Sequence, residues 1–188
     1  MQHFQNATSY LVDAIFNFAL YIVLIRFWMQ WVRADFRNQL GQFIIKATNP
    51  LVIPLRKIVP SIGLIDTATV IIACVIALAQ ITSLYAIAGA LGSVSFIKLL
   101  SYAVAIVLDS SIYVFLGAIF IGIIASWINP HSYNPVISVA RSISEPILAP
   151  ARRLIPPMGG LDFSPLIVIL FLRFSQQLLI APIYSLAI

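Results

Sequence analysis

Six polar side chains stand inside stretches of this sequence that are otherwise apolar. They are Asp13, Gln80, Asp109, Arg173, Gln176 and Gln177. Carboxylate, amide and guanidinium groups in apolar surroundings hold ions, relay protons or pair with one another. Arg173 lies near the middle of its stretch, where an arginine in a membrane costs roughly 2.5–3.5 kcal/mol on insertion scales. The chemistry these residues suggest is a polar pathway, with structural hydrogen bonds as the alternative.

The sequence leaves both interpretations of these residues open. Arg173 either hydrogen-bonds between helices, with Gln80, Gln176, Gln177 or a backbone carbonyl as partner, or contributes to a pore or substrate site. Asp13 and Asp109 either act as gate or proton-carrying residues or make polar contacts near the membrane interface. Asp109 is expected to reach Arg173 only if its helix lies deeper than the apolar boundaries suggest.

Other reactive constellations are scarce. The chain has two histidines and one cysteine, and it contains no HExxH, CxxC, GxSxG or P-loop pattern. We therefore predict that the protein is not an enzyme and that it uses no metal and no cofactor. The potassium-filter sequence TVGYG is also missing, which disfavours a conventional potassium channel.

The elements that hold these residues are predicted to be membrane helices. The 188 residues are 61% hydrophobic and 9% charged, against about 25% charged in ordinary soluble domains. Apolar runs of about 20 residues are typical of membrane helices. Four such runs occur, at roughly 11–32, 67–91, 104–128 and 164–186. The predicted fold is all-α, with four transmembrane helices.

The basic residues predict the orientation of these helices. Eight of the eleven fall in the two segments that follow the first and third runs, and the positive-inside rule places these segments in the cytoplasm and both termini on the other side. The net charge of +5 is then explained by topology and by contact with anionic lipid headgroups, so no nucleic-acid partner is expected. Arg26 is expected to extend its long stem to the headgroups.

One peptide occurs twice. NPLVIPLRKIVPSIGLID and EPILAPARRLIPPMGGLD align without a gap at the 96-position spacing that separates Pro50 from Pro146. The shared motif residues are Pro50, Pro54, Pro60, Gly63 and Asp66 in the first copy and Pro146, Pro150, Pro156, Gly159 and Asp162 in the second. The same spacing relates Asp13 to Asp109 and Gln80 to Gln176. We predict two parallel helix-loop-helix repeats, at 1–91 and 104–188, with a linker at 92–103.

Each loop is predicted to begin with an amphipathic helix in the membrane interface. Its apolar positions are Phe36, Leu40, Phe43, Ile44 and Ala47 in one copy and Val136, Val139, Ala140 and Ile143 in the other. The prolines that follow should allow only short helical pieces, because proline lacks the N–H and clashes with the preceding turn. Gly63 and Gly159 are expected to adopt positive φ, and Asp66 and Asp162 to cap the next membrane helix or to serve a ligand or proton.

The two basic pairs are candidate binding residues. Arg56 and Lys57 in the first copy match Arg152 and Arg153 in the second. We expect them to contact lipid headgroups and to set topology, or to bind a cytoplasmic protein. The polar residues of the second half would line a pathway only within a homo-oligomer, since four helices leave little room for a pore.

With these motifs in view, the sequence resembles the YggT family of small integral membrane proteins, also called the YlmG family. The resemblance rests on the repeated peptide and the helices around it. It implies a duplicated two-helix unit in a bacterial inner membrane or in a chloroplast. In a bacterial inner membrane, the orientation predicted from the basic residues places both termini in the periplasm. It brings no catalytic residues. The first copy departs from the second at Ser61 for Pro157 and Leu64 for Gly160.

The resemblance also implies the functions to weigh. Family members are linked to osmotic or salt-stress tolerance and potassium homeostasis, others to cell division or envelope organisation, and plastid relatives to assembly of a b-type cytochrome. We therefore favour a non-enzymatic protein that supports ion homeostasis through a duplicated platform for lipids or partner proteins. A small ion or solute conductor is the alternative, and an assembly factor for division or respiratory components is a third.

Overall fold

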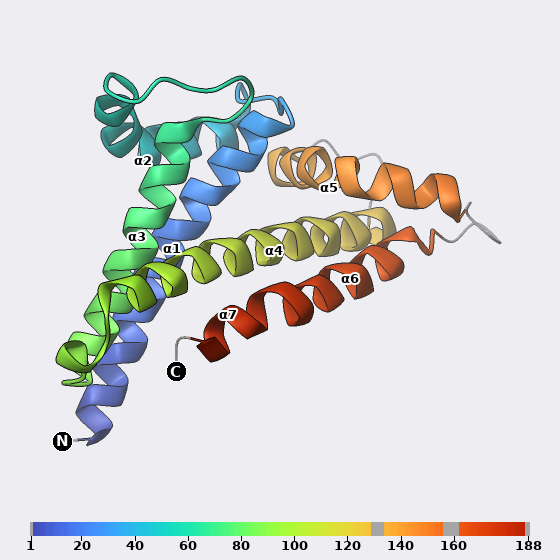
Figure 1. Ribbon diagram of the computed structural model, residues 1–188. Coiled ribbons are helices and arrows are strands. Elements are labelled where there is room, and N and C mark those ends of the chain that lie inside the picture. Colours follow the sequence, from blue (N-terminus) through green and yellow to red (C-terminus); the bar gives the residue numbers. More distant parts are fainter. Residues whose placement is uncertain (1, 129–133, 156–161, 187–188) are drawn as a thin grey trace.

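The computed structural model describes residues 2–128, 134–155 and 162–186, and it confirms the predicted all-α membrane fold (Figure 1). Within these ranges, four helical segments are long and apolar enough to cross a membrane. Three are α1 (Gln2–Trp31), α3 (Thr67–Ile87) and α4 (Phe96–Ile128). The fourth runs through α6 (Ser164–Ser175), a π-helical turn (Gln176–Ile180) and α7 (Ala181–Leu186).

The helices form the two predicted repeats. In the first, α1 packs along α3, and α2 (Gln39–Arg56) connects them. In the second, α5 (Pro135–Leu154) lies between α4 and α6 in the chain and contacts both. Figure 1 shows α2 and α5 at one end of the molecule and both chain termini toward the other. In this view α4 and α6 lie across the direction of α1 and α3, and contacts between α3 and α4 join the two repeats.

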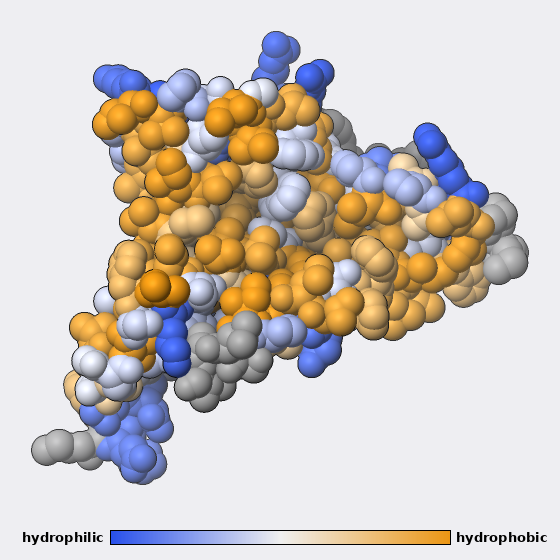
Figure 2. Space-filling model, in the orientation of Figure 1, coloured by the Kyte–Doolittle hydropathy of each residue, from blue (hydrophilic) through white to orange (hydrophobic). Residues whose placement is uncertain are grey.

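The main core lies between α1 and α3. Large side chains of α1, such as Leu20 and Leu24, are buried against small residues of α3, such as Ala73 and Ala77. Small residues allow helix axes to approach closely, which is how membrane helices gain van der Waals contact. Most of the outward surface is apolar, and Figure 2 shows hydrophilic residues mainly at the edges of this apolar surface. Such a surface suits hydrocarbon chains of lipid.

Two membrane helices begin earlier than their apolar runs. The 30 residues of α1 start at Gln2 and measure about 45 Å, against about 30 Å for the hydrocarbon core. The polar first turns of α1 extend the helix beyond the hydrocarbon, where hydropathy no longer marks a helix. Likewise α4 starts at Phe96, inside the 92–103 segment that the sequence analysis set between the repeats.

The prediction that proline breaks the interfacial helices is wrong. Both α2 and α5 continue through two prolines, Pro50 and Pro54 in α2 and Pro146 and Pro150 in α5. All four prolines are exposed, and within each helix they stand four positions apart, on one face. The carbonyls that lose a helical N–H partner therefore face water or headgroups, which satisfy them. Pro60 lies just beyond α2, in the connection to α3.

The interfacial helices are held by their caps and by a narrow buried face. The Asn38 side chain accepts a hydrogen bond from the Gly41 N–H at 2.7 Å, and Asn134 accepts one from Val136 at 2.8 Å. A Cβ on Gly41 would stand 2.8 Å from the Phe36 backbone, so this close approach requires glycine. Of the predicted apolar positions, Ile44, Val139, Ala140 and Ile143 are buried, whereas Phe43 and Val136 are exposed.

Candidate functional site

The repeated peptide builds the same ion pair in both repeats. Arg56 at the end of α2 binds the Asp66 carboxylate, which directly precedes α3. In the second repeat, Arg152 Nε lies 2.9 Å from Asp162 Oδ2, just before α6. We call these two pairs the Arg–Asp clasps. Each clasp fixes the end of an interfacial helix to the start of the next membrane helix.

The clasp of the first repeat is the more buried. Asp66 is 1% exposed, and the Thr69 hydroxyl donates to its Oδ2 at 2.5 Å. Burial by itself raises the pKa of this carboxyl. Hydrogen bonds from Thr69 and Arg56 and the positive charges of Arg56 and Arg26 outweigh burial, so the pKa lies below its ordinary value. Asp66 is therefore charged at neutral pH.

The clasp of the second repeat is more open and has an additional acid. Arg152 Nη1 also lies 2.8 Å from Glu145 Oε1, so one guanidinium serves two carboxylates. Burial opposes charge on Asp162, but bonds from Arg152 and Ser164 lower the pKa of its carboxyl. Asp162 Oδ1 accepts the Ser164 N–H at 2.9 Å, which confirms the predicted cap. The same prediction for Asp66 is wrong, because the Asp66 side chain bonds Arg56 and Thr69 instead of an amide.

A tight turn leads into the first clasp. Ile62 and Ile65 exchange two backbone hydrogen bonds of 3.0 Å around Gly63, whose φ of 60° confirms the predicted positive value. The Thr67 hydroxyl donates to the Pro60 carbonyl at 2.7 Å and closes the loop. Pro156 and Gly159, the equivalents of Pro60 and Gly63, lie outside the described residues.

Arg26 is buried beneath the first clasp. Its guanidinium donates to Thr48 Oγ1 at 2.5 Å and to Asn49 Oδ1 at 2.9 Å, and the residue is 6% exposed. The expectation that Arg26 reaches the headgroups is therefore wrong. Thr48 and Asn49 face α1 from the adjoining interfacial helix, so the guanidinium finds polar partners inside the protein. Arg26 thus ties α1 to α2.

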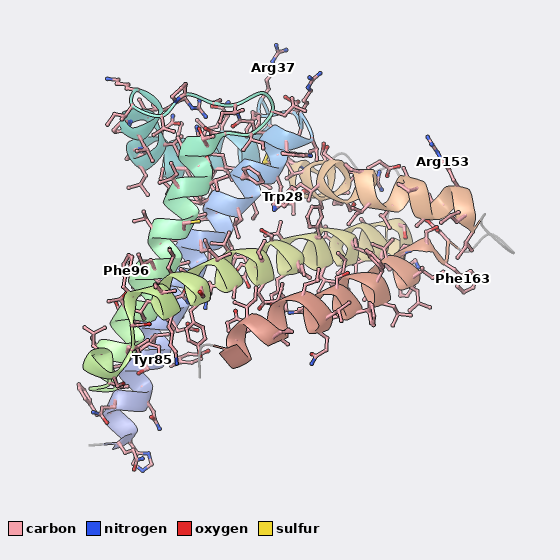
Figure 3. All side chains as sticks on the ribbon, viewed as in Figure 1. Trp28, Arg37, Tyr85, Phe96, Arg153 and Phe163 are labelled. Atoms are coloured by element: carbon pink, nitrogen blue, oxygen red, sulfur yellow. The ribbon has the colours of Figure 1, made fainter. Side chains whose placement is uncertain are left out.

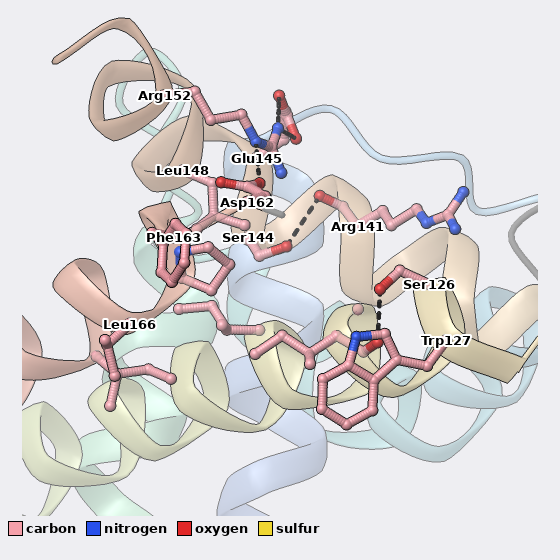
Figure 4. Close-up of a pocket in the computed structure, with 15 residues that line it drawn as sticks. Ser126, Trp127, Arg141, Ser144, Glu145, Leu148, Arg152, Asp162, Phe163 and Leu166 are labelled. Carbon is pink, nitrogen blue, oxygen red and sulfur yellow. Dashed lines mark hydrogen bonds and ion pairs between the residues drawn. The ribbon is translucent and has the colours of Figure 1, made fainter. Parts of the chain in front are cut away.

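The second repeat has a cavity at the equivalent place. Gly122, Ser144 and Glu145 correspond to Arg26, Thr48 and Asn49 at the spacing of the repeat. All three line a cavity of about 780 Å³ between α4, α5 and α6 (Figure 4). Arg152 and Asp162 of the second clasp line it as well. Where the first repeat has a buried cation, the second has an open volume.

Deeper in the membrane, each repeat contains one carboxylate–amide contact. Gln80 Nε2 donates to Asp13 Oδ1 at 2.7 Å, and Gln176 Nε2 donates to Asp109 Oδ1 at 2.6 Å. These bonds join α1 to α3 and α4 to the π-helical turn. Four of the six polar residues selected from the sequence therefore form two equivalent pairs.

The two pairs differ in what surrounds them. Arg173 Nη1 donates to Gln176 Oε1 at 2.9 Å, and its guanidinium lies 5.3 Å from the centre of the Tyr113 ring. Among the described residues, the hydrogen bonds that connect Arg173 to Asp109 pass through Gln176, which is on the same helical segment as Arg173. In the first repeat Ala77 stands at the position of Arg173, and Gln80 Oε1 is buried with no hydrogen bond from the described residues.

A second, smaller cavity adjoins the Arg173 group. It measures about 260 Å³, and its lining includes Asp109, Arg173, Gln176 and Gln177. The π-helical turn that carries both glutamines is a feature often found at functional sites. Arg173 itself is exposed.

The basic pairs separate into two kinds of residue. Arg56 and Arg152 are held in the clasps, whereas Lys57 and Arg153 are exposed and make no ion pair with the described residues. Sequence reasoning did not assign a site to Thr48, Asn49, Glu145 and Gly122. The signal was present, because the alignment of the two copies places Gly122 opposite Arg26 and Glu145 opposite Asn49.

Comparison with known proteins agrees with this architecture. A model of the CCB3/YggT family matches the chain twice, over residues 5–87 and 101–183. An uncharacterized protein of Pseudomonas aeruginosa is 40% identical over 93% of this chain and 89% of its own length. The protein YggT of Escherichia coli is 32% identical over 89% of this chain and 86% of its own length. No solved structure matches. The repeated helix-loop-helix unit, its membrane helices and these similarities establish that the chain belongs to the CCB3/YggT family.

Proposed function

We propose that this chain is a non-enzymatic protein of the bacterial inner membrane that supports osmotic-stress tolerance and potassium homeostasis. Its two interfacial helices form a platform on the cytoplasmic face, and the platform binds anionic lipid headgroups or a partner protein. Both chain termini then lie in the periplasm.

The arrangement of the basic residues supports this proposal. Each clasp holds the end of an interfacial helix, and the exposed residue next in the chain, Lys57 or Arg153, projects from that fixed end. Figure 3 shows Arg153 pointing away from the helices. Basic residues close to an anionic membrane surface contribute about 1 kcal/mol each to binding. Two exposed cations on rigid supports are suited to phosphate or carboxylate groups of a membrane or partner.

The test replaces the projecting cations and leaves the clasps intact. The double variant Lys57→Gln with Arg153→Gln should fail to restore potassium content after osmotic upshift in cells that lack the protein. Lys98→Gln, which neutralises a half-buried lysine of α4 near the opposite end, is the control and should restore it. Full activity of the double variant would contradict the platform.

A small conductor is the second candidate, and the Arg173 group favours it. Arg173, Gln176 and Asp109 form one connected polar chain at a cavity within the apolar helices. Because Arg173 is exposed in a single chain, a pathway would form between copies in a homo-oligomer. The test is potassium and sodium flux through sealed vesicles that contain the purified protein. Flux lost in Arg173→Ala would support conduction, and no flux from the folded, inserted protein would contradict it.

A further inference from the structure

The cavity of the second repeat and the Arg26 site of the first are the same place in two copies of one unit. In the first copy the guanidinium of Arg26 occupies it and donates to Thr48 and Asn49. In the second copy the position of that arginine is Gly122, and an added Cβ there would meet no atom within 4 Å. The first repeat therefore shows which group the second site can accommodate: a cation with N–H donors on an apolar stem.

The acceptors for such a cation are retained in the second repeat. The Thr48 hydroxyl donates to the Ile44 carbonyl and keeps a lone pair for Arg26. The Ser144 hydroxyl also donates to a carbonyl of its own helix, that of Arg141 at 3.3 Å, and Ser144 is 2% exposed. A lone pair of Ser144 is thus left to accept a bond from a group in the cavity.

The charged residues around the site also differ between the two repeats. In the first repeat, Arg26 and Arg56 face the single carboxylate of Asp66, which leaves one positive charge in excess. In the second, Arg152 pairs with the carboxylates of both Glu145 and Asp162, so these three residues carry one negative charge in excess. Arg141 also lines the cavity, and its side chain extends away from Glu145 and Asp162 in Figure 4. The lining as a whole therefore carries two positive and two negative charges, which suits a zwitterion with its cation beside Glu145.

The walls of the cavity indicate what carries the cation. The side toward the membrane is formed by Ile119, Ile123, Leu166 and Ile169. The polar side lies at the level of the interfacial helix, where headgroups reside. Its volume of about 780 Å³ falls within the roughly 300–1,000 Å³ of small-molecule sites. A suitable occupant has a cation that meets the acids and an anion near it that meets Arg141. Its apolar tail would lie against the apolar wall.

We propose that this cavity binds one phospholipid with a primary ammonium headgroup, phosphatidylethanolamine. The ammonium takes the place of the Arg26 guanidinium and donates to Ser144 and Glu145, the phosphate faces Arg141, and an acyl chain lies along the isoleucines. A quaternary ammonium has no N–H to donate, so phosphatidylcholine fits less well. This site goes beyond the proposed platform, because phosphatidylethanolamine is zwitterionic and the cavity does not include the exposed cations Lys57 and Arg153.

The test fills the cavity with the residue that the first repeat uses. Delipidated wild-type protein should bind one phosphatidylethanolamine per chain, measured by native mass spectrometry against phosphatidylcholine and phosphatidylglycerol. Gly122→Arg with Glu145→Asn reproduces the first repeat and should weaken that binding at least tenfold. Gly117→Leu, at an exposed position of the same helix, should leave it unchanged. Glu145→Gln, which keeps the shape of the site, should also weaken it if the filled variant does not fold.

The converse variant should create a site. Arg26→Gly with Asn49→Glu should raise the bound phosphatidylethanolamine to two per chain. Three results would each overturn the proposal. They are equal or tighter binding of phosphatidylglycerol or phosphatidylcholine, no lipid bound to the wild type, and full binding of phosphatidylethanolamine by the filled variant. Gly122→Arg alone fills the cavity and leaves Glu145 in the second clasp, so it should still restore potassium content if only the platform cations Lys57 and Arg153 matter for that function. Failure of the lipid site and failure of the platform are therefore distinguishable.

Discussion

At the scale of single residues, equivalent positions of the two repeats have different surroundings. Asp66 and Asp162 each bind an arginine ten positions earlier, yet the Asp66 side chain is 0% exposed and the Asp162 side chain is 33% exposed. A charged hydrogen bond contributes more where water cannot replace it. The same motif should therefore stabilise the two halves unequally.

Asp66→Asn should destabilise the protein more than Asp162→Asn. The first substitution should lower the free energy of unfolding by about 1.5–3 kcal/mol, as for a lost hydrogen bond to a charged group. The second should lower it by less than about 1 kcal/mol, as for an exposed ion pair. Denaturant titration in a mild detergent measures both. Equal losses would show that burial does not distinguish the clasps.

Acid should weaken the first clasp in a defined window. Because the pKa of Asp66 is lower in the folded protein, the folded state binds fewer protons than the unfolded state, and stability rises with pH there. The contribution is complete above the ordinary pKa of about 3.9 and disappears as the pH falls through the folded pKa. The Asp66→Asn variant should lack this component of the stability–pH curve. If the stability–pH curve of the variant were parallel to that of the wild type below a pH of about 4, the predicted contribution of Asp66 would be refuted.

At the scale of elements, the interfacial helices depend on polar contacts with the membrane helices beneath them. In the first repeat Arg26 connects α1 to α2 through two side chains. In the second repeat Gly122 makes no such connection from α4 to α5. The packing of α2 against α1 should therefore depend on the Thr48 hydroxyl, whereas the packing of α5 against α4 should not depend on the Ser144 hydroxyl.

Thr48→Val should loosen α2, whereas Ser144→Ala should leave α5 docked. Valine keeps the shape of threonine but removes an acceptor from the buried Arg26, at a cost of about 1–3 kcal/mol. Hydrogen exchange of residues 39–56 should accelerate in the first variant, and exchange of residues 135–154 should stay near wild type in the second. The assignment of Arg26 as a tie between helices fails if Thr48→Val leaves exchange in α2 unchanged.

At the scale of the whole molecule, two parallel repeats place both interfacial helices at one end (Figure 1). The positive-inside rule predicts that this end faces the cytoplasm. In a variant with Cys74 replaced, a cysteine at Ser61 should be protected from membrane-impermeant thiol reagents in intact cells. A cysteine at Ser93, in the exposed turn between α3 and α4, should react. The reverse pattern would invert the orientation.

Much of the fold could be predicted from the sequence because hydropathy and the repeat are local signals. The run that contains Gln80 was predicted as a helix, and the 96-position spacing related Gln80 to Gln176 correctly. The bond from Gln80 to Asp13 could not be predicted, since it depends on the register between two helices. Arg26 was misassigned for a similar reason, because its partners lie 22 and 23 positions away on another helix.

The prolines show a different limit. Proline has a low helix propensity, which predicts a break at Pro50 and Pro54, but this propensity does not depend on which face of the helix is exposed to solvent. Here both prolines are exposed, so the lost hydrogen bonds are replaced by solvent. The cavity at Gly122 was missed because sequence analysis attended to what the copies share, and this site lies where they differ.

The polar contacts of the first repeat join residues within that repeat, and this has a consequence for biosynthesis. Its clasp, its buried arginine and its carboxylate–amide pair all join residues between Asp13 and Gln80. These contacts can therefore form before the second half has left the ribosome, in line with the tendency of N-terminal units to fold first during synthesis. The completed first half would then present α3 as a ready surface for the arriving α4. An ancestral duplication would in this way have supplied the chain with its own assembly template.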